Sequence, residues 1–394
     1  MTESSPLRLL QIVPSVSLVY GGPSQMVLGL SQALGAAGAQ VTLLTTDSNG
    51  DAGQAPLDVP IAQPVLEKDY RIYYFRCAPW RRYKFSIGLL WWLWRHAPEY
   101  DVAHIHALFS PISTMAAIVC RWRKLPYVLR PLGTLDPLDL RKKARLKWWY
   151  GRLLERRNLA KAAAVHFTSA EECKISERFG AISRDWVIPL GVPLPPLREQ
   201  PMAQSSKEAG PMVLFMSRLD RKKGLDIVIP ALETLAVSGL PFRFVLAGAN
   251  VQDPDYEQSI SDYLNRSHLS DRTEIVGFVT GEQKRSLLAQ ADLFVLPSYY
   301  ENFGIAVAEA MAAGVPVVIS DQVHIWPDVA DTRSGWVCTC DVSSFAGAVR
   351  EALTQPTERQ QRGHNARRCA GDRYSWSAIA QQLIAAYGEI RRTR

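Results

Sequence analysis

The chain has 394 residues, of which 47% are hydrophobic and 21% charged, and its formal net charge is +7. This length and composition allow a large buried core and exclude a disordered or collagen-like chain. The positive charge is concentrated in residues 1–190, which carry 24 Lys and Arg against 15 Asp and Glu, so nucleic acid, anionic membranes and phosphorylated ligands are candidate partners.

The expected compartment follows from three absences in the sequence. The longest apolar run, Ile87–Trp94, has eight residues, whereas a membrane-spanning helix needs roughly 20. The N-terminus has one basic residue before a short apolar run and no small-residue cleavage site, which favours a first strand over an export signal. None of the six cysteines forms a Cys-x-x-Cys pair, so we expect reduced thiols, no metal site and a cytoplasmic protein.

Short apolar or β-branched runs alternate with helical stretches along the whole chain, a pattern typical of parallel sheets built from βαβ units. The first series of predicted strands lies at 9–13, 41–45, 73–75, 102–106, 127–129, 164–167 and 185–188. The second series lies at 213–216, 242–247, 273–276, 293–296 and 315–319. A last helix is predicted over 376–390 from its apolar spacing.

A stretch rich in Pro, Gly and Ser separates the two series, as expected of a linker between domains. We predict a first domain over 1–192, a linker over 193–211, a second domain over 212–375 and a C-terminal helix, 376–394, that packs back on the first domain. The expected fold class is α/β, with two Rossmann-like doubly wound domains facing a central cleft.

A glycine pair, Gly21-Gly22, follows the first predicted strand and precedes a helical pattern that opens with Pro23. Such a strand-to-helix turn offers backbone N–H groups to a phosphate or hydroxyl at the carboxyl edge of the sheet. The alternative is a plain tight turn, because the run is not the full Gly-x-Gly-x-x-Gly motif.

Two histidines, His104 and His106, share one face of the predicted strand over 102–106. His106 is nearer the carboxyl end, where open α/β sheets bind ligands, and is the functional candidate. A hydrogen-bonded core histidine is the alternative for both.

Two cations, Arg218 and Lys223, follow the first strand of the second series. Arg supplies a bidentate fork and Lys a point charge, so together they could neutralise a diphosphate without Mg²⁺. The alternative is a solvated basic loop that also contains Arg221 and Lys222.

Two glutamates, Glu301 and Glu309, follow the strand predicted over 293–296, one in the loop and one on an apolar helix that starts after Gly304. The helix N-terminus favours phosphate, and the carboxylates suit sugar or ribose hydroxyls. Glu309 stands among alanines, so we expect it to face a ligand or a partner.

These residues form a longer motif, Pro297-Ser298-x-x-Glu301-x-Phe303-Gly304-x-x-x-x-Glu309-Ala310-Met311-Ala312-x-Gly314-x-Pro316. The motif resembles the paired-glutamate signature of the retaining glycosyltransferases of family 4, which have the GT-B fold. Arg218, Lys223, the glycine pair and His106 occur in the order that this family shows, so the resemblance covers residues 8–390.

The resemblance implies a role for each candidate residue. Arg218 and Lys223 would hold the donor diphosphate, and Glu309 would hold the donor ribose. Glu301 and the backbone of Asn302, Phe303 and Gly304 would hold the transferred sugar, and His106 would contact the reacting sugar. The roles of Arg218, Lys223, Glu301 and His106 are catalytic in this assignment.

A further loop, Arg130-Pro-Leu-Gly-Thr-Leu-Asp136, follows a strand of the first series. It resembles an acceptor-side loop of family members that assemble polysaccharides, which makes Arg130 an acceptor or phosphate candidate beside Gly21 and Gly22. A turn built around Pro131 and Gly133 is the alternative.

The function implied is a retaining, metal-independent hexosyltransferase that moves a sugar from a nucleotide diphosphate sugar to an acceptor hydroxyl, without a cofactor. The acceptor expected is a lipid-linked saccharide of cell-surface or exopolysaccharide biosynthesis. The enzyme alternatives are transfer to a small soluble acceptor and a sugar-nucleotide epimerase. A basic nucleic-acid-binding protein is the other alternative, but the chain carries no nucleic-acid-binding signature, so we expect no such partner.

Two stretches of the first half combine cations with tryptophans: Trp80–Arg95, which contains Arg81, Arg82 and Lys84, and Arg141–Tyr150. This combination suits a surface that lies on an anionic membrane, so we expect a peripheral association at its cytoplasmic face. The alternative is that Leu89–Trp94 is core with basic flanks in solvent.

Overall fold

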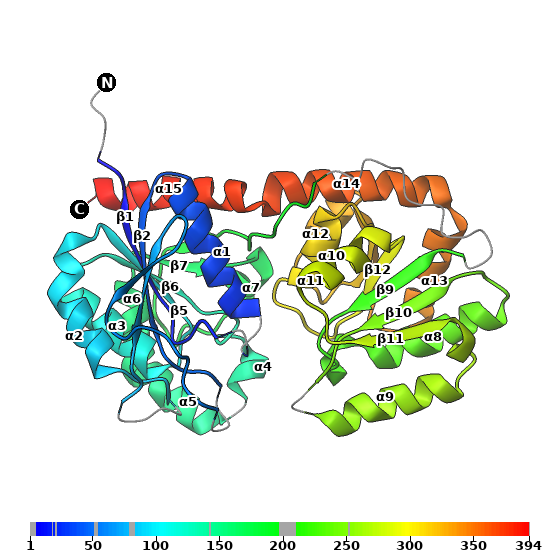
Figure 1. Cartoon of the computed structure of the whole chain (residues 1–394), viewed down its shortest axis with the longest axis horizontal. Coiled ribbons are helices and arrows are strands. Elements are labelled where there is room, and N and C mark those ends of the chain that lie inside the picture. The colour runs from blue at the N-terminus through cyan, green and yellow to red at the C-terminus, as the bar shows by residue number, and fades with distance from the viewer. Residues whose placement is uncertain are drawn as a thin grey trace. The chain divides into compact units, whose positions relative to one another are not determined.

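The computed structural model describes residues 5–17, 19, 22–50, 54–78, 83–141, 143–196, 210–250 and 253–393. The chain divides into two compact units, residues 1–191 with 376–394, and residues 192–375 (Figure 1). Most of the predicted linker, residues 197–209, lies outside the described part. Among the described residues, no helix has both the length and the apolar character needed to cross a bilayer.

The first unit is built on an eight-stranded sheet in the order β3-β4-β2-β1-β5-β6-β7-β8. All neighbours are parallel except β3 and β4, which are antiparallel. The strands are β1 Arg8–Ile12, β2 Gln40–Thr46, β3 Pro64–Leu66, β4 Arg71–Phe75, β5 Val102–His106, β6 Tyr127–Arg130, β7 Ala164–Phe167 and β8 Asp185–Val187. The sequence analysis missed β3, which has three residues, two of them exposed.

Helices cover both faces of this sheet, as the doubly wound class requires. Leu10 and Ile12 of β1 face a core formed with α2 and α3, whereas Leu9 faces a core formed with α1 and α15. The helices are α1 Gly22–Ala36, α2 Ile87–His96, α3 Pro111–Trp122, α4 Pro137–Leu140, α5 Ala144–Tyr150, α6 Arg156–Lys161, α7 Ala170–Ile175 and α15 Trp376–Arg392, with a π-helical turn at Gly151–Glu155.

The second unit has a six-stranded parallel sheet in the order β11-β10-β9-β12-β13-β14. Its strands are β9 Met212–Met216, β10 Arg243–Ala247, β11 Thr273–Gly277, β12 Leu293–Leu296, β13 Val317–Ser320 and β14 Gly335–Cys338. The short edge strand β14 was not predicted. The α/β class and the two doubly wound sheets are confirmed.

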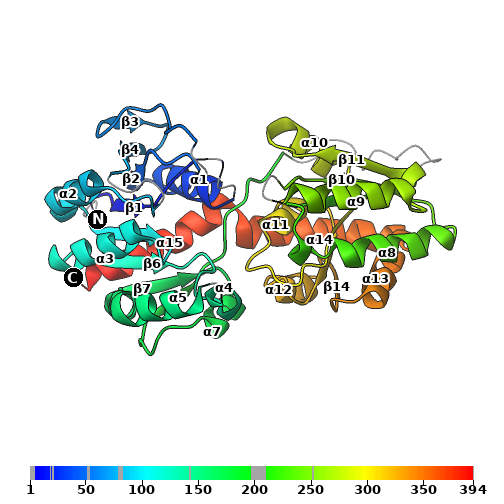
Figure 2. The same ribbon diagram turned by 90° about the horizontal axis from the view of Figure 1, so that it is seen from below.

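The helices of the second unit also lie on both faces of its sheet. In Figure 2, which is seen from below, α8 and α9 lie in front of the sheet and α14 lies behind it. The helices are α8 Leu225–Val237, α9 Pro254–Arg266, α10 Gly281–Gln290, α11 Ile305–Ala312, α12 Trp326–Asp331, α13 Val342–Thr354 and α14 Pro356–Tyr374. The order of strands along the chain reverses between β9 and β12, because β10 and β11 lie on one side of β9 and β12 lies on the other. Since β9 and β12 are parallel neighbours, the loops that follow them start at the same carboxyl edge of the sheet.

Candidate functional site

The loop after β9 carries two of the predicted cations. It ends in a 3₁₀ turn, Arg221–Lys223, whose cap Asp220 accepts a hydrogen bond from the N–H of Lys222. Gly224 follows with φ of +75°, and a Cβ at this position would lie 2.2 Å from the carbonyl oxygen of Pro297. Only glycine therefore lets the turn pack against Pro297, which follows β12 directly and begins the loop that carries Glu301.

This close packing brings Lys223 and Glu301 together. The Lys223 ammonium and the Glu301 carboxylate form an ion pair, and their side chains are 11% and 21% exposed. The backbone of Glu301 is fixed by two hydrogen bonds, from its N–H to the carbonyl of Gln322 (3.0 Å) and from the N–H of His324 to its own carbonyl (3.0 Å). The carboxylate is therefore held on a rigid loop.

Arg218 lies on the same loop but in a more open position. Its guanidinium donates to the carboxylate of Asp220 at 3.2 Å, and its side chain is 48% exposed. Within the described residues, its one ion pair is thus with a neighbour on its own loop. An exposed pair of this kind contributes little to stability, so Arg218 is available to an anionic ligand.

The three residues before α11 differ in what they expose. The Phe303 side chain is 3% exposed and packs edge-on against Tyr374, with ring centroids 5.3 Å apart. Asn302 accepts a hydrogen bond from the hydroxyl of Tyr300 at 3.0 Å. Gly304 is the N-terminal cap of α11. Phe303 is therefore an anchor of the loop, and it is the backbone at this helix N-terminus that could meet a ligand.

Glu309 has a partner that the sequence analysis missed. Its Oε1 lies 2.6 Å from the ammonium of Lys284 on α10, and the side chains are 12% and 26% exposed. This ion pair lies within the chain, so the expectation that Glu309 faces a ligand or a partner stays a prediction. No sequence signal marks Lys284, which stands 25 residues away on an ordinary polar helix.

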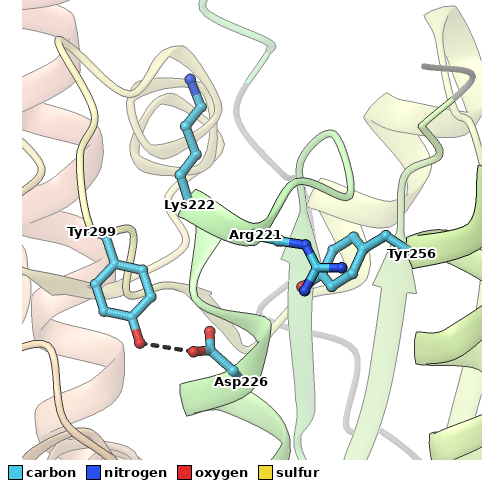
Figure 3. Close-up of a pocket in the computed structure, with 5 residues that line it drawn as sticks. All are labelled: Arg221, Lys222, Asp226, Tyr256 and Tyr299. Atoms are coloured by element: carbon cyan, nitrogen blue, oxygen red, sulfur yellow. Dashed lines mark hydrogen bonds between the residues drawn. The ribbon is translucent and has the colours of Figure 1, made fainter. Parts of the chain in front are cut away.

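A pocket of about 360 Å³ opens beside the 3₁₀ turn and is lined by Arg221, Lys222, Asp226, Tyr256 and Tyr299 (Figure 3). The Tyr299 hydroxyl donates to Asp226 at 2.8 Å, and desolvation, together with this carboxylate, raises the pKa of Tyr299 to about 12. The Arg221 guanidinium lies over the ring of Tyr256, 4.6 Å from its centroid. None of the five residues was predicted to bind a ligand.

In the first unit, His106 is fully buried at the carboxyl end of β5. Its Nε2 donates to the side-chain carbonyl of Gln11 at 2.7 Å, and its Nδ1 finds no hydrogen-bond partner within the described residues. Burial and the nearby Arg130 charge lower its pKa far below the usual value. His106 is thus a neutral imidazole whose Nε2 is hydrogen-bonded to Gln11 and whose Nδ1 has no partner among the described residues.

His104 belongs to a chain of hydrogen bonds that ends at the backbone. His166 Nε2 donates to the carbonyl of Ile188 at 2.8 Å, so its Nδ1 accepts from His104 Nε2 at 3.3 Å. His104 Nδ1 then accepts from the hydroxyl of Tyr387 on α15 at 2.6 Å. For His104 the alternative interpretation, a hydrogen-bonded core histidine, is correct.

Arg130 lies in the same buried layer, at 1% exposure. One nitrogen contacts the sulfur of Met26 on α1 at 2.7 Å, and Nε and Nη2 have no partner among the described residues. Burial lowers its pKa to about 10, so the side chain stays cationic at neutral pH. Gly22 is the first residue of α1, one residue earlier than predicted, Pro23 lies in the first turn as predicted, and Gly21 lies outside the described residues.

The loop after His106 is strained and held by a buried acid that was not predicted. Ala107 and Phe109 have φ of +65° and +56°, a region that costs energy for residues other than glycine. Glu155, 1% exposed, accepts from the Phe109 N–H, from the hydroxyl of Thr114 and, at 3.2 Å, from the amide of Asn158. Glu155 therefore positions the loop beside His106.

The first of the two cationic and aromatic stretches is partly core. Leu89 and Leu93 of α2 are fully buried, whereas Ile87 and Trp91 are 61% and 65% exposed. The alternative interpretation is therefore right for the two leucines and wrong for Trp91. Trp80, Arg81 and Arg82 lie outside the described residues.

No group of three or more His, Cys, Asp or Glu side chains within the described ranges is placed to hold a metal ion. Lys223 pairs with Glu301 and Lys284 with Glu309, and Arg218 lies on the same loop as Lys223.

Two family descriptions match the chain, one for each unit. Residues 21–191 match "Glycosyl transferase 4-like domain" and residues 198–369 match "Glycosyl transferases group 1". An uncharacterized glycosyltransferase of Methanocaldococcus jannaschii is 31% identical over 45% of this chain and 44% of its own length. The phosphatidyl-myo-inositol mannosyltransferase of Mycobacterium leprae is 26% identical over 98% and 97%.

The first curated relatives are matched over less than half of their own length. Among solved structures, Anabaena Alr3699/HepE, determined in complex with UDP and glucose, covers 97% of this chain and 99% of its own with a TM-score of 0.70 and 20% identity. This similarity shows that the chain shares the fold of that protein.

Proposed function

Because the chain belongs to the family 4 glycosyltransferases, which have the GT-B fold, we propose that it transfers a sugar from a nucleotide diphosphate sugar to an acceptor hydroxyl. The observation that carries this proposal is the pairing of Lys223 with Glu301 and of Lys284 with Glu309 around α11. Each pair presents a cation beside a carboxylate. A nucleotide diphosphate sugar needs this combination, with cations for phosphate oxygens and carboxylates for hydroxyls.

The second unit supplies the donor groups in this proposal. Lys223 and Arg218 hold the diphosphate, and the N-terminus of α11 adds a positive dipole end. Glu301 accepts hydrogen bonds from the transferred sugar, and Glu309 accepts them from the ribose. The fixed backbone of Glu301 supports this role, because an oriented acceptor costs less entropy on binding.

Transfer proceeds with retention and without a metal ion in this proposal. The charge that grows on the departing diphosphate is stabilised by Lys223, Arg218 and the helix dipole. A leaving phosphate oxygen takes the proton of the acceptor hydroxyl on the same face of the sugar. His106 contacts the reacting sugar as a neutral hydrogen-bonding group, which its depressed pKa supports.

We further propose that the acceptor is a lipid-linked saccharide of cell-surface polysaccharide assembly, used at the cytoplasmic face of a membrane by a peripherally bound enzyme. The basic first half and the exposed Trp91 support an anionic surface as partner. The relative from M. leprae, matched over nearly its whole length, has by its name a phosphatidyl-inositol acceptor.

The test is donor turnover by the purified full chain, with UDP-, GDP- and ADP-linked sugars and a membrane extract that contains lipid-linked saccharides. We expect one donor to be consumed only when the extract is present, and a product with the anomeric configuration of the donor by NMR. Inversion would contradict the retaining proposal. Conversion of the donor to an epimer without an acceptor would favour the epimerase instead.

A further inference from the structure

A second pocket, of about 490 Å³, lies in the first unit against α4 and α5. Its apolar lining includes Leu140, Trp148, Trp149 and Phe179, and its charged lining includes Arg141 and Arg145. A concave apolar site with a few convergent charged groups is the usual form of a small-molecule site. The pocket is separate from every residue to which the proposed function gives a role.

The wall formed by α5 is unusually exposed. None of the seven residues of this helix is buried, and Leu146, Trp148 and Trp149 are 66%, 47% and 57% exposed. The π-helical turn that follows adds Leu153, at 67%. Exposed large apolar side chains that are grouped on one segment mark a binding site for a protein, a membrane or a ligand.

The floor of the pocket is fixed. Phe179 is 8% exposed and has φ of +55°, a strained conformation for an aromatic residue. A Cβ on Gly151 would lie 2.4 Å from the Phe179 ring, so glycine at 151 makes room for it. Phe179 also meets Phe109 edge-on, with centroids 6.1 Å apart. This packing holds the ring in place as a rigid apolar surface.

The charges around the pocket favour an anion. Residues 139–157 carry eight Lys and Arg but only two acids. Asp139 is paired with Lys147 at 2.7 Å, and Glu155 is buried on Thr114 and Asn158. Glu177, also in the lining, accepts the N–H of Phe179.

Within the described residues, Arg141 and Arg145 make no ion pair, and both side chains are exposed. The pocket therefore combines apolar walls with two arginines that form no ion pair among the described residues, and its lining holds one acid, Glu177, whose carboxylate is bound to the Phe179 N–H.

We propose that this pocket binds one phosphate-linked lipid chain, with the hydrocarbon on Trp148, Trp149 and Phe179 and the phosphate on Arg141 and Arg145. The inference rests on the proposed function, because it makes this lipid the carrier of the acceptor saccharide. The loop from Arg130 to Asp136 links β6 to α4, which lines the pocket. The N–H of Glu177 donates to the carbonyl of Leu135 in this loop at 2.9 Å.

The test uses geranyl diphosphate as a soluble probe, with geraniol and inorganic pyrophosphate as its two halves, and calorimetry on the full chain. We expect geranyl diphosphate to bind at least about tenfold more tightly than either half. Trp149→Ala should weaken it about tenfold, and the double variant Arg141→Glu with Arg145→Glu should weaken it while sparing geraniol. Trp91→Ala is the matched control, since Trp91 is an exposed tryptophan on α2 outside the pocket.

Equal affinity of wild type and Trp149→Ala for geranyl diphosphate would overturn the proposal, as would equal affinity for pyrophosphate and geranyl diphosphate. Loss of binding to anionic vesicles by Trp149→Ala, with normal affinity for the probe, would also overturn it and make α5 a membrane contact. Stabilisation by nucleotide sugars is measured on the same samples. Its absence would count against the proposed function, whereas a change in probe affinity alone bears on the pocket.

Discussion

The ammonium of Lys284 lies 2.6 Å from the carboxylate of Glu309, and both side chains are largely buried. A donor ribose that binds Glu309 would share it with this lysine. Because the pair joins α10 to α11, it also fixes the direction of the Glu309 side chain. Glu309 is thus oriented before a ligand arrives, which reduces the entropy that binding costs.

We predict that Glu309→Gln lowers kcat/KM for the donor by roughly 10²-fold while the chain stays folded, because a neutral amide accepts a hydroxyl proton less strongly than a carboxylate. Glu282→Gln is the control, since Glu282 lies on α10 with its side chain 83% exposed. Steady-state kinetics with far-UV circular dichroism check both variants. Near-normal turnover by folded Glu309→Gln would remove this residue from the donor site.

Lys223 and Arg218 are expected to act on the diphosphate. Lys223→Met and Arg218→Met should each lower the rate of transfer roughly 10²-fold. Lys222→Met, the neighbouring lysine of the same turn, should change it only a few-fold, because Lys223 and not Lys222 forms the ion pair with Glu301. A single-turnover assay at saturating donor gives the rates. Similar losses in all three variants would indicate damage to the loop instead of lost contacts.

Metal removal should leave the reaction intact. We expect activity in excess EDTA to stay within about twofold of the untreated enzyme, because Lys223, Arg218 and the α11 dipole neutralise the diphosphate. The assay is donor consumption before and after chelation. Complete loss with recovery in Mg²⁺ or Mn²⁺ would refute the metal-independent mechanism.

The buried histidines lead us to predict how the stability of the fold changes at low pH. Burial lowers the pKa of His166 to about 3 and those of His104 and His106 far below the usual value, whereas an unfolded imidazole titrates near pH 6.5. Between these values the unfolded chain binds more protons, so the free energy of unfolding falls as the pH drops from about 6.5 towards 3, by about 1.4 kcal/mol per pH unit for each histidine.

His166→Asn should reduce the slope of the free energy of unfolding against pH by about 1.4 kcal/mol per pH unit, the contribution of one histidine, because asparagine does not titrate. Tryptophan fluorescence follows the first unit selectively, since only Trp326 and Trp336 lie outside it. Urea midpoints at a series of pH values supply the slope. The same slope in His166→Asn and wild type would contradict the assignment.

Association with membranes is the fifth prediction. The full chain should co-sediment with anionic vesicles at low salt and lose this binding as salt rises. Exchange of Arg81, Arg82 and Lys84 for Glu should weaken it at least about tenfold. The control is the same charge change at three exposed arginines of the second unit, Arg266, Arg350 and Arg368. Equal vesicle binding by both triple variants would contradict a role for this stretch.

The predicted strands and the observed ones agree within about two residues where an apolar run is buried on both faces, as in β5, β7 and β12. Of the four edge strands, β8 and β11 were predicted, whereas β3 and β14 were not. β3 begins with a proline and has no buried residue, so its sequence carries none of the apolar pattern by which the other strands were recognised.

For the candidate site, the sequence indicated which residues carry chemistry but not what they touch. Glu309 stood out among alanines, yet its partner Lys284 comes from a different helix. His106 was recognised because it lies near the carboxyl end of a predicted strand. Gln11, which holds its ring by a hydrogen bond, is 95 residues away in the sequence. Such contacts depend on which strands become neighbours in the sheet, and no local pattern encodes this. Glu155 was missed for the same reason.

The most direct test of the central claim, that the second unit holds a nucleotide diphosphate sugar between Lys223, Glu301 and Glu309, is calorimetric titration of nucleotide sugars into the wild-type chain and Lys223→Met. We predict that one nucleotide sugar binds the wild type and that its affinity falls at least about tenfold in the folded variant. Equal affinity in the two proteins, or no binding of any nucleotide sugar to the folded wild type, would contradict the account.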